Sequence, residues 1–163
     1  MQKYIVRHGL SQANNHENFG TPAFGSAGAE LMPEGWAHAR HAGKVLVSNY
    51  HFNPVTTHVA TSHMRRTQQT ALGAGFAPEN MTAYSLLDEV TSGLSFDQIA
   101  NAILLEIPPP SAIAQVEALL DNPPEEPIWF THGLVIASIC YIRGITTTRF
   151  IPRFGEVRKI NIG

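Results

Sequence analysis

Two kinds of segment alternate along the chain. Short runs rich in β-branched and aromatic residues are each followed by a longer stretch whose apolar residues recur every three or four positions. The short runs are typical of buried strands and the longer stretches of amphipathic helices. The alternation predicts an α/β fold, a three-layer α/β/α sandwich whose mostly parallel central sheet carries helices on both faces. At this length we expect a single domain over residues 1–163.

The pattern also predicts where the elements lie. The expected strands cover residues 4–6, 55–61, 83–87, 128–131 and 156–162. The expected helices cover residues 33–50, 63–75 and 96–104, a stretch after Ser111, and 134–142. Ser62 and Ser111 are placed to cap the second and fourth helices, because a hydroxyl can accept the free N–H groups of a first turn. The last strand alternates imperfectly, which is typical of a sheet edge.

Charge and composition limit the expected partners. Eleven Lys and Arg against thirteen Asp and Glu argue against nucleic acid and anionic membranes, since both attract clustered positive charge. The apolar runs are shorter than the roughly 20 residues of a bilayer span, and the start of the chain resembles a strand and not an export signal. The single cysteine, Cys140, forms no internal disulfide and is compatible with a reducing compartment. We expect a cytoplasmic protein that binds neither nucleic acid nor membrane.

Chemically active side chains follow four of the expected strands. Arg7-His8-Gly9 follows the first strand, residues 62–66 the second, Asp88-Glu89 the third and His132-Gly133 the fourth. Ligands of open α/β sheets bind beyond the carboxyl ends of the strands. Two histidines, at least one arginine and a carboxylate are therefore expected to meet at one edge of the sheet.

Such a set can transfer a phosphoryl group without a metal ion or cofactor. Arginine suits phosphate oxygens, helix N-termini supply N–H donors, and a neutral imidazole is a nucleophile. A carboxylic acid can protonate the leaving oxygen and then deprotonate water. The chain has no Gly-rich loop followed by Lys and Ser or Thr. His38 and His41 stand three apart on one expected helix, but no partner pair completes a metal site, and we expect both on its solvent-exposed surface.

The first of these motifs resembles the signature of a known family. Arg7-His8-Gly9 directly after a strand resembles the histidine phosphatase, or phosphoglycerate mutase-like, superfamily. Ser11 and Asn14 stand where that family has Ser or Thr and Asn, although the pair could instead build the turn after the strand. Residues 31–35, Leu-Met-Pro-Glu-Gly, resemble the family's Leu-Thr-x-x-Gly helix entry.

Three later segments match the same family in the same order. Residues 62–71 resemble its Ser-Pro-Leu-x-Arg-Ala-x-Gln-Thr-Ala segment, which aligns Arg66, not Arg65, with the phosphate-binding arginine. Residues 87–93 resemble the segment that carries the acid, and His132-Gly133 resembles the second histidine. The resemblance thus spans nearly the whole chain and implies a phosphatase of the small branch.

The resemblance also implies roles for individual residues. His8 would be the nucleophile, with one ring nitrogen held by a backbone carbonyl, for which Gly9 is the candidate, and the other free to attack. Glu89 would be the general acid, with neighbouring Asp88 as the alternative. Phosphate binding and stabilisation of the transition-state charge would fall to Arg7, Asn14, Arg66, His132 and Gly133.

Two departures favour hydrolysis over mutase chemistry. Residues 12–14 are Gln-Ala-Asn where mutases have a Trp-Asn pair, and residues 89–93 are Glu-Val-Thr-Ser-Gly where mutases have Glu-Arg-x-Tyr-Gly. No Lys or Arg lies in residues 8–39 or 67–142, which include both segments expected to line the substrate mouth. A mutase must hold a doubly phosphorylated intermediate, and a mouth without cations suits that poorly.

The spacing of the motifs bears on the substrate. Only 42 residues, 90–131, separate Glu89 from His132, too few for the long cap of mutases, so we expect an open site. With Phe19, Phe24 and Phe96 near it, such a mouth favours a small phosphomonoester with a neutral or apolar leaving group, ahead of a phosphoprotein. The alternatives are mutase-type transfer and a non-catalytic phosphate-binding module of the same fold. The sequence leaves the physiological substrate and the oligomeric state open.

Overall fold

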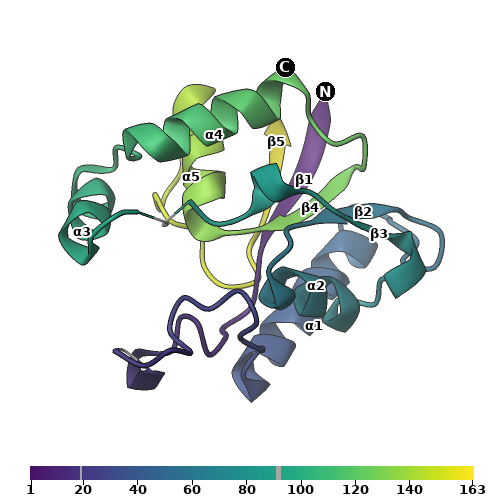
Figure 1. Ribbon diagram of the computed structural model, residues 1–163. Coiled ribbons are helices and arrows are strands. Elements are labelled where there is room, and N and C mark those ends of the chain that lie inside the picture. The colour runs from purple at the N-terminus through teal and green to yellow at the C-terminus, as the bar shows by residue number, and fades with distance from the viewer. Residues whose placement is uncertain (19, 91–92) are drawn as a thin grey trace.

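A central sheet organises the computed structural model, which describes residues 1–18, 20–90 and 93–163 (Figure 1). Within these residues one sheet forms in the order β3-β2-β4-β1-β5. Its strands are β1 (Gln2–Arg7), β2 (Val59–Thr61), β3 (Met81–Ala83), β4 (Ile128–Thr131) and β5 (Val157–Asn161). The first four run parallel, and β5 pairs antiparallel with β1 at one edge. The expected mostly parallel sheet and the edge position of the last strand are confirmed.

Helices cover both faces of the sheet (Figure 1). α1 (Pro33–Ser48) and α2 (Arg65–Gly73) pack together on one face, and α4 (Pro110–Asp121) and α5 (Gly133–Ile142) on the other. α3 (Phe96–Leu105) lies at the outer end of the second layer. Short 3-10 turns are η1 (His16–Asn18), η2 (Pro78–Asn80) and η3 (Ser85–Leu87). The three-layer α/β/α arrangement is confirmed.

The two central strands are buried on both faces because their side chains alternate between the two layers. Ile5 of β1 and Trp129 of β4 belong to the apolar cluster that includes α4 and α5. Val6 and Phe130, the next residue on each strand, belong to the cluster that includes α1 and α2. Strands buried in this way are continuously apolar, which is why the sequence pattern located them well.

The structure corrects two of the expected strands. β2 begins at Val59 and not at residue 55, since Val55 is 75% exposed and its N–H donates to the Asn53 side chain at 3.0 Å. That side-chain acceptor forms a turn in place of the strand ladder. β3 covers Met81–Ala83, and the expected strand at 83–87 is mostly the turn η3.

The expected serine caps are also wrong. α2 starts at Arg65, so Ser62 lies before it and its hydroxyl accepts the Met64 N–H at 3.1 Å. α4 starts at Pro110, which puts Ser111 inside the first turn. A serine cap does occur at α3, where Ser95 and Gln98 form a reciprocal capping box.

In the described part of the chain no single helix has the length and hydropathy of a membrane span. α3 and α4 have them only as a pair, bent by 70°.

Candidate active site

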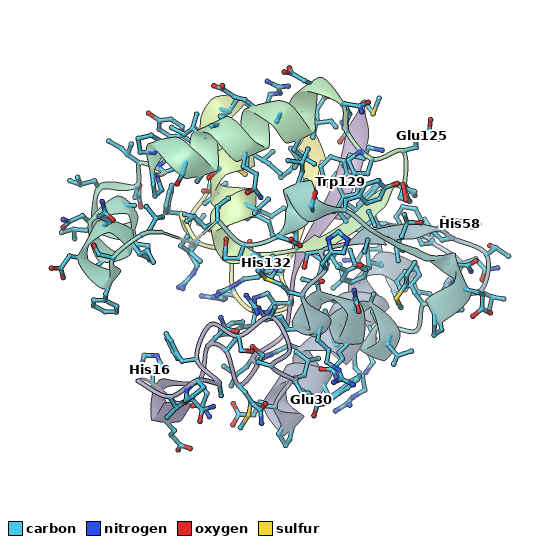
Figure 2. All side chains as sticks on the ribbon, viewed as in Figure 1. His16, Glu30, His58, Glu125, Trp129 and His132 are labelled. Atoms are coloured by element: carbon cyan, nitrogen blue, oxygen red, sulfur yellow. The ribbon has the colours of Figure 1, made fainter. Side chains whose placement is uncertain are left out.

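Two histidines meet at the carboxyl ends of the central strands. Arg7 of β1 pairs in register with Thr131 of β4, so the residues that follow, His8 and His132, leave the sheet side by side. Their ring centroids are 5.1 Å apart and both side chains are buried. Figure 2 shows His132 at the end of β4, where the chain enters α5. The sheet therefore joins two motifs that are 124 positions apart in the sequence.

The His8 ring is held in one tautomer. Its Nδ1 lies 2.7 Å from the carbonyl oxygen of Gly9, and because a carbonyl only accepts, Nδ1 carries the proton and Nε2 keeps a lone pair. Burial lowers the pKa of His8 well below its usual value, and the charges of Arg7 and Arg66 lower it further. The expected backbone contact is confirmed, and His8 is neutral at pH 7.

The loop that carries His8 is tightly fixed between α1 and α2. The Gly9 N–H donates to the Thr70 hydroxyl of α2 at 3.0 Å. On its other side Gly9 packs so closely on Gly35 of α1 that a Cβ on Gly9 would lie 2.2 Å from the Gly35 carbonyl oxygen. A glycine is therefore required here by close backbone approach, and His8 stands on a rigid support.

Arg7 is held by the loop between α5 and β5. Its Nη1 donates to the Pro152 carbonyl at 2.8 Å, and its guanidinium lies 4.0 Å from the centre of the Phe154 ring. Burial lowers the pKa of Arg7 to about 10, opposed by the charge of Glu89, so Arg7 stays protonated at neutral pH. Gly133 makes room for this side chain, because a Cβ there would lie 3.0 Å from Arg7 Nε.

Sequence reasoning missed Phe154 and misjudged His38. The Phe154 ring stacks on His38 at 5.7 Å with an interplanar angle of 17°, and it also lies 5.9 Å from the His8 ring. His38 is half-buried, and its Nδ1 accepts the Leu10 N–H at 3.2 Å. The expected solvent-exposed surface position is therefore wrong for His38. No local pattern could reveal a contact between residues 38 and 154, since only the fold brings them together.

Arg66, not Arg65, lies in the site. The Arg66 side chain is buried, and its Nη1 donates to the Ser26 carbonyl at 3.1 Å. Arg65 is exposed and pairs with Glu30 at 3.3 Å, and Figure 2 shows Glu30 well away from His132. Adjacent helical residues point about 100° apart, which explains why only one of the two reaches inward. Burial lowers the pKa of Arg66, opposed mainly by Glu89.

Glu89 faces the two arginines. Its Oε1 accepts the Val90 N–H at 3.1 Å, and its Oε2 lies 3.5 Å from the Leu134 N–H at the start of α5. Burial raises the pKa of Glu89, although these N–H groups and both arginines oppose the rise. Asp88 is engaged elsewhere, because its Oδ1 accepts the His63 N–H at 2.7 Å. Of the two carboxyl groups, that of Glu89 is the one that acts on both Arg7 and Arg66.

His132 is bound from one side only. Its Nε2 lies 2.9 Å from the Ser62 hydroxyl oxygen, while its Nδ1 is buried and has no hydrogen-bond partner among the described residues. Burial lowers the pKa of His132 well below its usual value, and the neighbouring His8, Arg66 and Arg7 add to this effect. Neutral His132 can thus offer Nδ1 to a ligand as either a donor or an acceptor.

Three buried nitrogens share this lack of a partner. Among the described residues, the buried side-chain polar atoms without a hydrogen bond are Arg7 Nε, Arg66 Nε and His132 Nδ1. Buried polar atoms are almost always paired in folded proteins. Two of the three belong to guanidinium groups, so the arrangement fits an anion with several acceptor oxygens.

Other expected site residues lie at the edge of this arrangement. The Asn14 side-chain oxygen accepts a hydrogen bond from the Ser11 hydroxyl at 2.6 Å, and the Asn14 backbone N–H donates to the Ser11 carbonyl. Ser11 and Asn14 thus build the turn after the strand, which was the alternative to phosphate binding. Phe24 and Phe96 are 39% and 66% exposed, and their place at the mouth stays a prediction. Of the expected mouth residues, Phe19 and 91–92 lie outside the described residues.

The loop between α5 and β5 carries a cation whose charge reaches Arg7. Arg149, in the loop between α5 and β5, lies close enough to lower the pKa of Arg7. Its side chain is exposed, and its carbonyl accepts an Arg158 N–H at 2.7 Å. Residues 8–39 and 67–142, which have no Lys or Arg, are therefore not the only segments whose charge bears on the site.

The chain is similar to known proteins in sequence profile and in fold. Residues 3–103 match the profile of the histidine phosphatase superfamily (branch 1). A crystal structure of TTHB049 from Thermus thermophilus is 22% identical, with 99% of this chain and 94% of that chain covered and a TM-score of 0.68. A phosphoglycerate mutase from the same organism is also 22% identical, with 99% and 93% covered and a TM-score of 0.65.

A structure of mycobacterial hydrolase 1 is more distant. It is 21% identical, with 86% of this chain and 79% of that chain covered and a TM-score of 0.52. No curated protein is significantly similar to the chain in sequence. At these identities the solved structures show that the fold is shared.

Proposed function

Because the chain belongs to the histidine phosphatase superfamily, branch 1, we propose that it is a metal-independent phosphatase that hydrolyses a phosphomonoester through a phosphohistidine on His8. The observation that carries the proposal is the set of three partnerless buried nitrogens, on Arg7, Arg66 and His132, beside the unprotonated Nε2 of His8. A phosphoryl group has enough oxygens to accept from all three while its phosphorus faces a nucleophile.

In the first step His8 Nε2 attacks phosphorus. The P–N bond forms, the P–O bond to the leaving group breaks, and Glu89 in its acid form gives its proton to the leaving oxygen. The raised pKa of Glu89 favours that acid form. Arg7 and Arg66, both still protonated, stabilise the charge on the equatorial oxygens.

In the second step the Glu89 carboxylate takes a proton from water. The resulting oxygen attacks phosphorus, the P–N bond breaks, and inorganic phosphate leaves. His8 returns to its neutral tautomer, in which Nδ1–H still donates to the Gly9 carbonyl. Glu89 is again protonated, so the cycle closes without any added group.

The charge distribution supports hydrolysis over mutase-type transfer. A mutase must retain a bisphosphorylated intermediate, whereas Arg7 and Arg66 together balance only one dianion. The further cation whose charge reaches Arg7, Arg149, is exposed. We therefore infer a small substrate with a single phosphate on a neutral or apolar leaving group; a phosphoprotein would be the second choice.

The test is phosphate release from a generic aryl phosphate in EDTA. His8→Ala removes the nucleophile, and His41→Ala, on the exposed surface of α1, is the matched control. We expect EDTA-resistant turnover in the intact protein and in the control, and none in His8→Ala. Equal turnover in His8→Ala contradicts the proposal. Vanadate binding without any turnover would favour the non-catalytic module, and dependence on a bisphosphorylated primer would favour a mutase.

A further inference from the structure

Two buried hydroxyls lie behind His132, on the side away from its partnerless nitrogen. Ser62 and Thr67 are both fully buried. The Ser62 hydroxyl oxygen lies 2.9 Å from His132 Nε2 and 2.8 Å from the Thr67 hydroxyl oxygen. The Thr67 hydroxyl can donate to the Met64 carbonyl at 2.9 Å. His132, Ser62 and Thr67 thus form a chain of three polar groups, referred to below as the relay.

One arrangement of the protons satisfies both hydroxyls in full. Thr67 donates to the Met64 carbonyl, Ser62 donates to Thr67, and His132 Nε2–H donates to Ser62. Each hydroxyl oxygen also accepts one backbone N–H, that of Met64 on Ser62 and that of Ser62 on Thr67. In this arrangement Nδ1 of His132 has a lone pair and cannot donate.

A second arrangement reverses the relay. Thr67 rotates to donate to Ser62, and Ser62 rotates to donate to His132 Nε2. The proton of His132 is then on Nδ1, as a donor pointing away from the relay. Among the described residues this arrangement has one hydrogen bond fewer, because the Met64 carbonyl loses the Thr67 hydroxyl. A phosphoryl oxygen that accepts from Nδ1–H makes up for the lost bond with a new one, whereas in the first arrangement that oxygen would face a lone pair.

We propose that Ser62 and Thr67 are positioning residues that reverse the tautomer of His132 when a phosphoryl group enters. In the free protein His132 carries its proton on Nε2, and with the anion bound it carries it on Nδ1. One proton leaves Nε2 and one joins Nδ1 by exchange with water, so the ring stays neutral and the proton count is unchanged. The inference rests on the proposed function for its ligand, an anion with phosphate geometry, and does not require turnover.

The charges at the site explain why the ring stays neutral. Arg7 and Arg66 both face His132 and disfavour a third positive charge. A phosphate dianion is balanced by these two guanidinium groups, with Glu89 in its acid form. The remaining requirement at His132 is a neutral donor, which the second arrangement supplies.

Nitrogen NMR of protein labelled with 15N-histidine tests the inference directly. The two ring nitrogens of His132, assigned by comparison with His132→Asn, are measured without ligand and with saturating orthovanadate. We expect a protonated Nε2 in the free protein and a protonated Nδ1 in the complex. The same tautomer in both states, an imidazolium in either state, or resonances that vanadate leaves unchanged would overturn the inference.

A pair of variants at Thr67 separates positioning from packing. Thr67→Val keeps the side-chain shape but removes the acceptor for Ser62. The buried Ser62 hydroxyl then stays unpaired unless it donates to His132 Nε2, so we expect Nδ1 to carry the proton even without ligand. Vanadate should then bind as tightly as to the intact protein, or severalfold more tightly. Thr67→Ser keeps the hydroxyl and should still reverse. The inference is overturned if ligand-free Thr67→Val carries the His132 proton on Nε2, or if Thr67→Val binds vanadate more than about threefold more weakly than the intact protein. It is also overturned if His132 of Thr67→Ser keeps the same tautomer when vanadate binds.

The outcomes are independent of catalysis. If the protein turns over no aryl phosphate and His132 still reverses with vanadate, the proposed phosphatase activity fails and this inference stands. If turnover proceeds and His132 does not reverse, the inference fails alone.

Discussion

Substitutions of Phe154 should show whether the aromatic ring itself, and not only the packing of its loop, holds the Arg7 guanidinium in place. The Phe154 ring lies 4.0 Å from the Arg7 guanidinium on one side and stacks on His38 on the other. Phe154→Leu keeps an apolar side chain of similar volume but removes the ring face. Phe154→Tyr keeps the ring and is the matched control.

The magnitude follows from the desolvation of Arg7. Burial lowers the pKa of Arg7 to about 10, so this cation is largely out of water. A cation–π contact is worth about 2 kcal/mol when desolvated. If that contact holds the guanidinium in the position where it stabilises the transition state, losing the contact costs about 2 kcal/mol of transition-state stabilisation. Because a factor of ten in rate corresponds to roughly 1.4 kcal/mol, kcat/KM should fall by about thirtyfold. The free energy of unfolding should fall by about 2 kcal/mol, since the free folded protein loses the same contact. Packing should add little to this, because most of the buried volume remains.

The assay is steady-state hydrolysis of an aryl phosphate, with urea unfolding measured alongside. We expect Phe154→Leu to lose about thirtyfold in kcat/KM and Phe154→Tyr to stay within threefold of the intact protein. Unchanged kcat/KM in Phe154→Leu would contradict the proposed role of the ring. So would a parallel loss in both variants, since that would show that the loop and not the ring supports Arg7.

Three other substitutions test the remaining parts of the site. Because burial raises the pKa of Glu89, its acid form persists to higher pH, and kcat/KM should fall as the pH rises through that pKa. Glu89→Gln should lower kcat by about 10²-fold or more and abolish this fall in kcat/KM with pH, while Asp88→Asn should change kcat less than threefold. Gly133→Ala puts a Cβ 3.0 Å from Arg7 Nε and should weaken vanadate binding about tenfold by equilibrium titration, whereas Gly28→Ala, in open surroundings, should not. Arg66→Ala should weaken vanadate binding by at least about tenfold. Arg65→Ala removes only an exposed ion pair worth about 0–1 kcal/mol and should leave vanadate binding unchanged. Equal effects at positions 65 and 66 would contradict the assignment of Arg66.

The elements that depend on the local periodicity of apolar residues were predicted well from the sequence. Residues such as Ile5 and Trp129 lie in strands buried on both faces, so apolar runs marked the centre of the sheet. The site residues at the strand ends could be grouped because parallel strands deliver their carboxyl ends to one edge. The start of β2 could not be located, since the Asn53 side chain competes with the strand ladder there.

Contacts between distant segments were beyond sequence reasoning. Phe154 supports Arg7 only because the loop after α5 folds back over the end of β1, and no motif marks that loop. Ser62 was expected to cap a helix, which is the common role of a serine at such a position. Its hydroxyl instead contacts His132, 70 positions away.

Trapping the phosphohistidine on His8 is the decisive experiment for the proposed mechanism. The protein is mixed with excess aryl phosphate, quenched in alkali within one turnover, digested and mapped by mass spectrometry, with His8→Asn as the control. We expect one phosphoryl group on His8, formed and lost at rates at least as fast as turnover and missing from the control. Phosphate release that proceeds with no phosphoryl group on His8, or with one on another residue, would contradict it.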